Sequence, residues 1–264
     1  FWPELTGGAV FEDDVQKDIF AHYADNAVEI DAGHLDALCE AARRNSIAIY
    51  AGIIEKSRER GGFSLYACLV YISPEGKIGS AHRKLMPTYE ERLVWSPGDG
   101  NGLRVHELGG FTVGGLNCWE NWMPLPRAAL YGQGENLHVA VWPGSRRNTI
   151  DITRFIARES RSFVVSVSGM MHADRIPDSV PHADKIRQAA SGWLADGGSC
   201  VAGPDGQWVL EPQVEEEGLF VVEIDRNDVA RERQNFDVAG HYSRPDVTKL
   251  RVNRKRQKTV SFEY

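Results

Sequence analysis

The residue at position 118 has surroundings suited to nucleophilic chemistry. Cys118 lies in the stretch GGLNCWENWMP, residues 114–124, after small and apolar residues and before a tryptophan–glutamate pair. A turn that follows a strand exposes one side chain, and nearby backbone N–H groups can lower a thiol pKa and stabilise an anion. A free cysteine is otherwise a small, usually buried and unreactive residue. Cys118 is therefore either a nucleophile or a packing residue.

Two charged residues upstream of Cys118 could supply a base and a positive charge. Glu55 follows the apolar run SIAIYAGII, residues 46–54, and a carboxylate at the end of a buried strand can have the raised pKa of a general base. Lys84, in HRKLMP, could stabilise a developing anion. Each also has a structural interpretation: the glutamate would mark the exit of a strand into solvent, and the lysine would be a solvated side chain.

Glu91 fits a structural motif that leaves room for a catalytic one. The run Thr88-Tyr89-Glu90-Glu91 matches a capping box, in which the glutamate side chain accepts a hydrogen bond from the threonine backbone N–H. Such a cap does not exclude a second contact that orients Lys84. The sequence therefore predicts that Glu91 caps a helical turn and leaves open a second role in orienting the lysine.

The composition excludes several classes of protein. The chain has 264 residues, 42% hydrophobic and 25% charged, which is typical of a folded protein. The net charge of −7 disfavours a nucleic-acid or anionic-membrane binder, although residues 249–258 are basic and are interpreted as a solvated or subunit-contacting tail. No apolar run approaches membrane-spanning length. The sequence therefore predicts no nucleic-acid partner and no membrane partner.

The other cysteines and the histidines show no metal or disulfide pattern. Cys39, Cys68 and Cys200 lie on a helical pattern, inside a strand and beside a hairpin strand, so we interpret them as packing residues. Four cysteines without a CxxC pair form no disulfide framework, which favours a reducing cytoplasm. The eight histidines show neither H-x-E nor HExxH spacing. We predict no metal and no cofactor.

Strand and helix patterns mix along the chain and predict an α/β fold with a mixed α+β sheet. The expected helices cover residues 14–23, 35–44, 126–131 and 153–162. Turns are expected at Ser73-Pro74-Glu75-Gly76 and Gly203-Pro204-Asp205-Gly206. The expected strands are residues 46–54, 64–72, 77–80, 111–116, 137–142, 163–167, 199–202, 207–210 and 219–224.

Taken together, these residues and the segments around them resemble the nitrilase branch of the carbon–nitrogen hydrolase superfamily. The segments run in the expected order from about residue 50 to residue 247: AGIIEK, HRKLMPTYEERLVWSPGDG, GGLNCWENWMPL, VAVWPGS, DGGSCVAGPDG and RQNFDVAGHYSRPDV. The resemblance implies a four-layer α-β-β-α sandwich and a single hydrolase domain over residues 1–264. The strand and helix with which the family normally begins are not present in this sequence.

The resemblance also assigns the site. It places the family's catalytic triad at Glu55, Lys84 and Cys118, and its additional glutamate at Glu91. Trp95 and Trp119 match positions that line the family's substrate pocket, and Trp142 suggests a further aromatic wall, although core packing accounts for tryptophan almost as well.

The implied activity is hydrolysis of an organic nitrile to a carboxylic acid and ammonia. Cys118 would attack the nitrile carbon, Glu55 would act as the base, and Lys84 would stabilise charge with the Trp119 backbone N–H as a second donor. The resemblance implies homo-oligomers in which dimers build larger spirals. The alternatives are a cyanide hydratase or dihydratase, an amidase of the same fold, or a non-catalytic protein. The sequence leaves the nitrile open.

Overall fold

A computed structural model describes residues 12–190 and 192–260 of the chain. Its contacts divide the chain into two compact units, each built from separate stretches of sequence. Unit 1 comprises Phe1–Gly102, His172–Leu194 and Asn253–Tyr264, and unit 2 comprises Leu103–Met171 and Ala195–Val252. The single domain expected over residues 1–264 stays a prediction.

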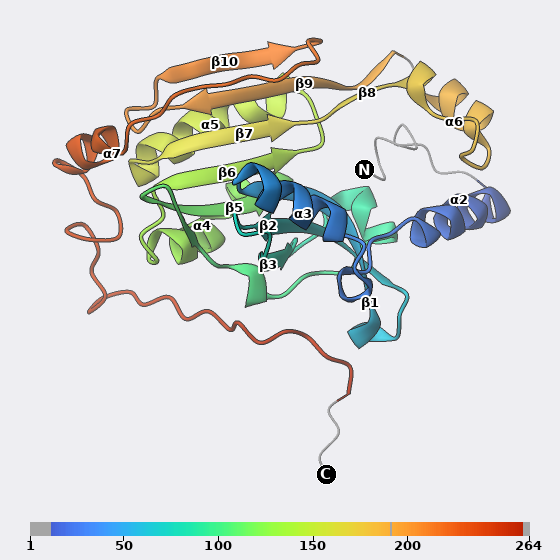
Figure 1. The fold of residues 1–264 in the computed structure, drawn as a ribbon, viewed down its shortest axis with the longest axis horizontal. Helices are drawn as coiled ribbons and strands as arrows, with labels where there is room; N and C mark the ends of the chain where they lie inside the picture. The colour runs from blue at the N-terminus through green and yellow to red at the C-terminus, as the bar shows by residue number, and fades with distance from the viewer. Residues whose placement is uncertain (1–11, 191, 261–264) are drawn as a thin grey trace. The chain divides into compact units, whose positions relative to one another are not determined.

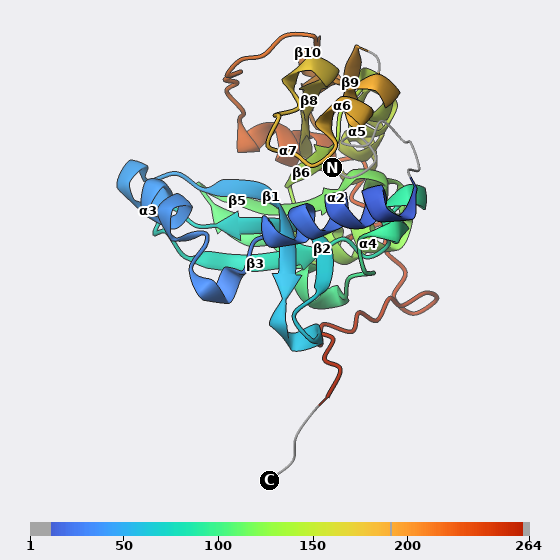
Figure 2. The ribbon, with the colours of Figure 1, turned by 90° about the vertical axis from the view of Figure 1, so that its right-hand side faces the viewer.

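Unit 1 is built on a three-stranded antiparallel sheet in the order β1-β2-β3. The strands pair in register, so that Ile53 lies opposite Cys68 and Cys68 lies opposite Arg83. Figure 2 shows these strands with α2 and α3. The elements are β1 (Ile49–Ser57), β2 (Ser64–Ile72), β3 (Ile78–Arg83), α2 (Asp13–Asp25), α3 (Asp36–Asn45) and α6 (Ala183–Ala189), with short 3-10 turns that include η3 (Tyr89–Leu93).

Side chains alternate between the two faces of this sheet, and each face has its own apolar cluster. On one face, Ile53, Cys68 and Val70 pack against α3. On the other, Ile54, Leu65 and Ala67 pack with residues of α2 and with Trp95. Neighbouring residues of one strand therefore contact different clusters. This alternation also gives Arg83 and Lys84 different partners.

Unit 2 contains a mixed sheet in the order β10-β9-β7-β6-β5-β4, with β8 paired to β9 (Figure 1). Strands β5, β6 and β7 are parallel, and α4 and α5 lie between them in sequence as crossover helices. The elements are β4 (His106–Leu108), β5 (Phe111–Asn117), α4 (Pro124–Tyr131), β6 (Leu137–Trp142), α5 (Arg146–Ser160), β7 (Phe163–Ser168), β8 (Met170–His172), β9 (Trp193–Ala202), β10 (Trp208–Val214) and α7 (Arg226–Arg233).

The core of unit 2 joins α5 to the sheet. Ile152, Ile156 and Ala157 of α5 are fully buried and form a cluster with strand residues and with Cys118. Burying an aliphatic side chain of this size contributes roughly 1.5–3 kcal/mol. The helix that follows β6 is thereby attached to the layer that carries the cysteine.

Most of the predicted elements are present, but several bounds and one element differ. The strand expected over residues 219–224 is wrong: Leu219 and Val221 are 90% and 81% exposed, and this segment forms no strand. No neighbouring strand in the described part of the chain pairs with it. The strand expected to end at Ile54 continues to Ser57, because its last residues pair with β2.

No helix among the described residues is both long enough and apolar enough to cross a membrane.

Candidate active site

Cys118 lies at a sharp turn between a strand and a 3-10 helix. Strand β5 ends at Asn117, and the 3-10 turn η5 (Cys118–Trp122) begins at once. The φ angle of Cys118 is +54°, in the left-handed region that residues other than glycine rarely adopt. Such a conformation costs about 1–3 kcal/mol and persists only where the surroundings hold it. The predicted turn at the end of the strand is confirmed.

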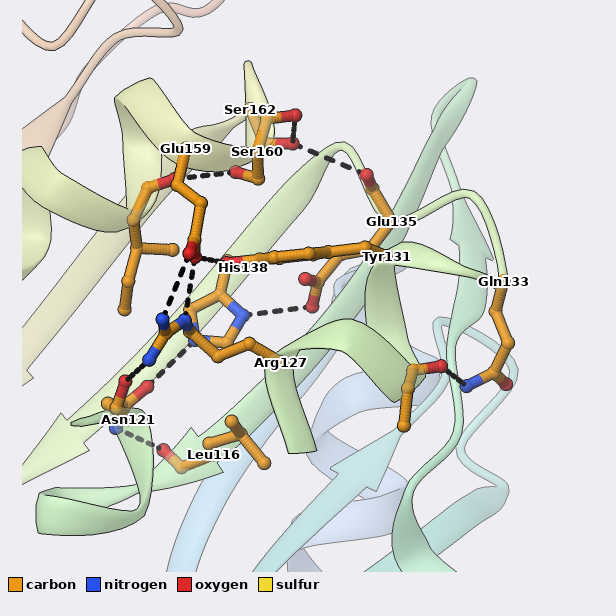
Figure 3. Close-up of polar contacts among 12 residues, drawn as sticks. Leu116, Asn121, Arg127, Tyr131, Gln133, Glu135, His138, Glu159, Ser160 and Ser162 are labelled. Atoms are coloured by element: carbon orange, nitrogen blue, oxygen red, sulfur yellow. Dashed lines mark hydrogen bonds and ion pairs between the residues drawn. The ribbon is translucent and has the colours of Figure 1, made fainter. Parts of the chain in front are cut away.

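The turn is held by its own side chains. Asn117 and Glu120 form a capping box, in which Glu120 Oε2 accepts from the Asn117 backbone N–H at 3.0 Å. Asn121 is fully buried, and its Nδ2 donates to Leu116 O at 3.2 Å (Figure 3). It also donates to Cys118 O at 2.9 Å. Glu120 and Asn121 were not predicted from the sequence, although residues 117–120 have the Asn-x-x-Glu spacing of a capping box.

The three predicted substrate-binding tryptophans lie in different surroundings. Trp142 is 1% exposed, belongs to the core cluster that contains Cys118, and donates to Ser166 Oγ at 3.3 Å. Trp95 is 3% exposed and donates to Tyr23 Oη at 3.1 Å. Both have the burial and partners of core residues, and their pocket role stays a prediction.

Trp119 is the predicted tryptophan that solvent reaches. It directly follows Cys118, is 50% exposed, and stacks on Trp122 with ring centroids 6.2 Å apart. Trp122 is itself 44% exposed. Two aromatic rings beside the cysteine provide an apolar surface for an organic group.

Lys84 is a buried cation with a dedicated partner. It follows the last residue of β3, and its backbone N–H donates to Ala67 O at 2.8 Å. Its side chain is 2% exposed, and Nζ donates to Glu91 Oε2 at 2.6 Å and to Thr88 Oγ1 at 3.3 Å. The solvated alternative for this lysine is therefore wrong.

Glu91 makes the predicted capping contact and also binds Lys84. Its Oε2 accepts from the Thr88 backbone N–H at 2.5 Å, which completes the capping box at the start of η3, and the same oxygen accepts from Lys84. A single carboxylate thus caps the start of a 3-10 turn and also neutralises a buried ammonium. Burying that ammonium without a counter-charge would be costly.

Glu55 lies inside β1 and binds Arg83. The Arg83 guanidinium donates to both carboxylate oxygens, from Nε at 2.8 Å and from Nη2 at 2.6 Å, and also to Ser57 Oγ at 3.0 Å. It lies 4.3 Å from the centre of the Tyr66 ring. Burial disfavours the charge of Arg83, but the hydrogen bonds and charge of Glu55 outweigh it and raise the pKa of the guanidinium.

This pairing separates Glu55 from Lys84. Arg83 and Lys84 are consecutive, so their side chains leave the extended chain on opposite sides. The alternative in which Glu55 marks the exit of its strand into solvent is wrong, since the carboxylate is buried two residues before the end of β1. The structure thus joins Lys84 to Glu91 and Glu55 to Arg83. A base role for Glu55 stays a prediction.

The other three cysteines have the features of packing residues. Burial raises the pKa of the Cys39 and Cys200 thiols. Burial, followed by the nearby charge of Glu55, raises the pKa of Cys68 well above its usual value. At neutral pH these groups are thiols and not the reactive thiolates. All four cysteines are free.

Within residues 12–190 and 192–260, no group of three or more His, Cys, Asp or Glu side chains is arranged to hold a metal ion.

Comparison with known proteins identifies the family. The family model for carbon-nitrogen hydrolases matches residues 1–234. The chain belongs to the carbon-nitrogen hydrolase family. It is 36% identical over 255 residues to Nitrilase 1 of Arabidopsis thaliana, covering 93% of this chain and 71% of that protein. It is 35% identical to an aliphatic nitrilase of Sinorhizobium fredii, covering 91% of this chain and 76% of that protein.

Solved structures of this hydrolase family share the fold. The NitN amidase from Nesterenkonia sp. AN1 matches with a TM-score of 0.61 and 20% identity, covering 83% of this chain and 78% of that chain. A carbon-nitrogen hydrolase from Helicobacter pylori matches with a TM-score of 0.60 and 18% identity, covering 79% of this chain and 72% of that chain. The predicted nitrilase-type fold is confirmed.

The Glu55–Arg83 pair generates a stability prediction. In Glu55→Gln, a 97% buried guanidinium loses its counter-charge, and breaking a buried pair in this way costs about 3–5 kcal/mol. Urea unfolding of the variant and the wild type measures the difference. The matched control is Glu29→Gln, which removes the partner of the exposed Arg58 and should cost about 0–1 kcal/mol. Equal effects of the two substitutions would contradict the structural role of Glu55.

The raised thiol pKa values generate a labelling prediction. Because Cys39, Cys68 and Cys200 are held as thiols, their thiolate fractions increase only as the pH rises above neutral. We expect iodoacetamide at neutral pH to label Cys118 first in the native protein, as measured by mass spectrometry of the cysteine peptides. All four should react in urea. Labelling of Cys68 or Cys200 ahead of Cys118 would show that Cys118 is not the activated thiol.

Proposed function

We propose that this protein is a nitrilase that uses Cys118 to hydrolyse an organic nitrile to the carboxylic acid and ammonia. The observation that carries the proposal is the left-handed turn that places this one cysteine at the start of η5, beside two exposed tryptophans. The similarity to several curated nitrilases supports the same activity.

The reaction consumes one nitrile and two waters. The Cys118 thiolate adds to the nitrile carbon, and the nitrogen takes up a proton to give a covalent thioimidate. A first water adds to this carbon, the C–N bond breaks, and ammonia leaves a thioester. A second water attacks the thioester, the C–S bond breaks, and the carboxylic acid leaves with the thiol restored.

Lys84 is suited to stabilise the charge that develops in these additions. An ammonium has three N–H donors, and Glu91 and Thr88 accept two of them. Among the described residues no acceptor is seen for the third, and we assign it to the substrate nitrogen or the tetrahedral oxygen. A charge held by buried partners needs little rearrangement as the reaction proceeds, which is the source of electrostatic catalysis.

Two glutamates are candidates for the general base that activates Cys118 and water. Glu55 is the candidate from the sequence, but Arg83 already occupies both of its oxygens. Solved variants of the Nesterenkonia amidase carry substitutions at a glutamate and at a cysteine 104 residues further along the chain. In this chain Glu55 precedes Cys118 by 63 residues, Glu12 by 106 and Glu4 by 114. Glu12 is exposed and pairs with Lys185, so Glu4, which lies outside the described residues, is the second candidate.

The proposal also covers the reaction product, the preferred nitriles, the assembly and the location of the protein. One relative, from Lupinus angustifolius, is a bifunctional nitrilase/nitrile hydratase, so the ratio of acid to amide is to be measured together with ammonia. The stacked Trp119 and Trp122 favour nitriles with an apolar organic group over cyanide. Homo-oligomeric assembly and a cytoplasmic location, supported by the family resemblance and the free thiols, belong to the same proposal.

The nucleophile and the cation are tested by substitution. Purified protein is assayed for ammonia, acid and amide from aliphatic, aromatic and arylacetic nitriles, cyanide and simple amides. We expect Cys118→Ala to abolish turnover, and Lys84→Ala to reduce it about a hundredfold or more, because each removes a group that acts in the transition state. Cys39→Ala is the control and should behave as wild type. A folded Cys118→Ala protein that still hydrolyses nitriles would exclude this mechanism.

The two candidate bases are separated by comparing rate with stability. We expect Glu4→Gln to lose about a hundredfold or more in kcat at an unchanged melting temperature, the pattern of a lost catalytic group. Glu55→Gln should lower the melting temperature through Arg83. Rates are measured well below the melting temperature of each variant. A Glu4→Gln enzyme of wild-type rate beside a folded, inactive Glu55→Gln enzyme would assign the base to Glu55.

A further inference from the structure

A line of three fully buried polar side chains leads to the Cys118 turn from inside unit 2. Glu135, His138 and Asn121 each have 0% of their surface exposed. His138 Nδ1 lies 2.9 Å from Glu135 Oε1, and His138 Nε2 lies 2.8 Å from Asn121 Oδ1 (Figure 3). Polar groups are rarely buried this deeply without a purpose in structure or function.

The hydrogen bonds of Asn121 determine where His138 carries a proton. Asn121 Nδ2 donates to Leu116 O and Cys118 O, which are carbonyl oxygens and can only accept. The amide oxygen is therefore the atom that faces His138, and it also can only accept. His138 Nε2 must then carry a hydrogen and donate it to Asn121.

One further proton is shared by Glu135 and His138. It lies either on Nδ1, giving an imidazolium beside a carboxylate, or on Glu135 Oε1, giving a carboxylic acid that donates to a neutral imidazole. Both arrangements have zero net charge and both keep the hydrogen on Nε2. Glu135 Oε2 has no hydrogen-bond partner among the described residues.

The strands make room for this pair. Gly114 of β5 lies opposite His138 of β6, and a Cβ atom on Gly114 would stand 2.2 Å from Glu135 Oε1. Any larger residue at position 114 would displace the carboxyl group. The backbone carbonyl of Glu135 accepts from Arg233 Nη2 at 2.6 Å, which fixes the residue from the other side.

A second arm holds the main chain of Asn121. Arg127 Nη1 donates to Asn121 O at 2.8 Å, and the same guanidinium binds Glu159 through Nε at 2.8 Å and Nη2 at 3.1 Å. Tyr131 Oη donates to Glu159 Oε2 at 2.8 Å. Burial disfavours the charge of Arg127, but its contacts with Glu159 outweigh this effect and raise its pKa. Asn121 is thus held at its backbone and at its side chain.

We propose that Glu135 and His138 are positioning residues for the nucleophile. They keep the hydrogen of His138 on Nε2, this hydrogen orients the Asn121 amide, and the amide holds the Cys118 carbonyl in the left-handed turn. Neither residue touches the substrate in this scheme. The inference rests on the proposed role of Cys118.

The test removes the hydrogen bond at His138 Nδ1 in one variant and keeps a hydrogen bond there in another. In Glu135→Leu only the Asn121 oxygen still favours the hydrogen on Nε2. The imidazole is then freer to carry it on Nδ1 and present a bare nitrogen to that oxygen. In Glu135→Gln the amide can donate to Nδ1 and preserve the neutral imidazole with its hydrogen on Nε2. Ser160→Ala is the matched control, because it removes one buried hydrogen bond, to Ile156 O, away from the turn.

Each variant is measured in two ways. Its kcat and KM are determined on the best nitrile, and the rate of iodoacetamide labelling of Cys118 is followed by peptide mass spectrometry. We expect Glu135→Leu to lower both kcat and labelling about tenfold, the effect of a lost buried hydrogen bond, with little change in KM. Glu135→Gln should stay within about threefold of wild type, and Ser160→Ala should change neither rate. Nitrogen-15 NMR of histidine should show the Nε2–H form of His138 in the wild type and in Glu135→Gln.

Several outcomes would overturn the proposal. A folded Glu135→Leu protein with wild-type labelling and kcat removes the positioning role, and so does a Glu135→Gln protein as impaired as Glu135→Leu. If Glu135→Leu does not fold, Asn121→Asp replaces it: the variant keeps an acceptor for His138 but loses the donors to Leu116 O and Cys118 O, and should show the same loss of labelling. Labelling needs no nitrile, so it tests positioning even if Cys118→Ala leaves hydrolysis intact and the proposed function fails.

Discussion

The chemistry proposed for this chain depends on a single backbone conformation, the left-handed turn at Cys118. A non-glycine residue with a φ of +54° is disfavoured unless its surroundings enforce it. Here the enforcement comes from hydrogen bonds on both sides of the cysteine: the Asn117–Glu120 capping box and the amide of Asn121, which binds the carbonyls of Leu116 and Cys118. The proposed nucleophile is thus held in place through the backbone of its turn.

Buried charges recur in both units, and each has a partner. Lys84 has Glu91, Arg83 has Glu55, and Arg127 has Glu159. A buried pair adds little net stability compared with apolar residues, but loss of one member leaves an uncompensated charge. Such pairs are therefore better understood as fixing geometry. In unit 1 this geometry separates two neighbours: Arg83 anchors β3 to β1, while Lys84 is oriented by a 3-10 turn on the other side.

The comparisons and the geometry answer different questions. Family membership establishes the class of bond that is cleaved, and the likeness to solved structures establishes the fold. The contacts in this chain show how individual side chains are held. For Glu55 the family resemblance and the observed contacts point to different roles. The resemblance assigns Glu55 to catalysis, whereas its hydrogen bonds are those of a structural ion pair. In Glu91 they agree, since one carboxylate oxygen serves the cap and the lysine.

The sequence by itself determined the elements and the local motifs, because these depend on neighbours along the chain. The apolar run before Cys118, the turn after it, and the Thr88–Glu91 capping box are all local patterns, and all are present. Only the tertiary structure decided what Glu55 and His138 contact, because these contacts depend on strand register and on which face a side chain takes. A shift of one residue would have exchanged the partners of Arg83 and Lys84. The segment 219–224 has the apolar pattern of a strand but no strand beside it, and a strand exists only where another supplies its hydrogen bonds.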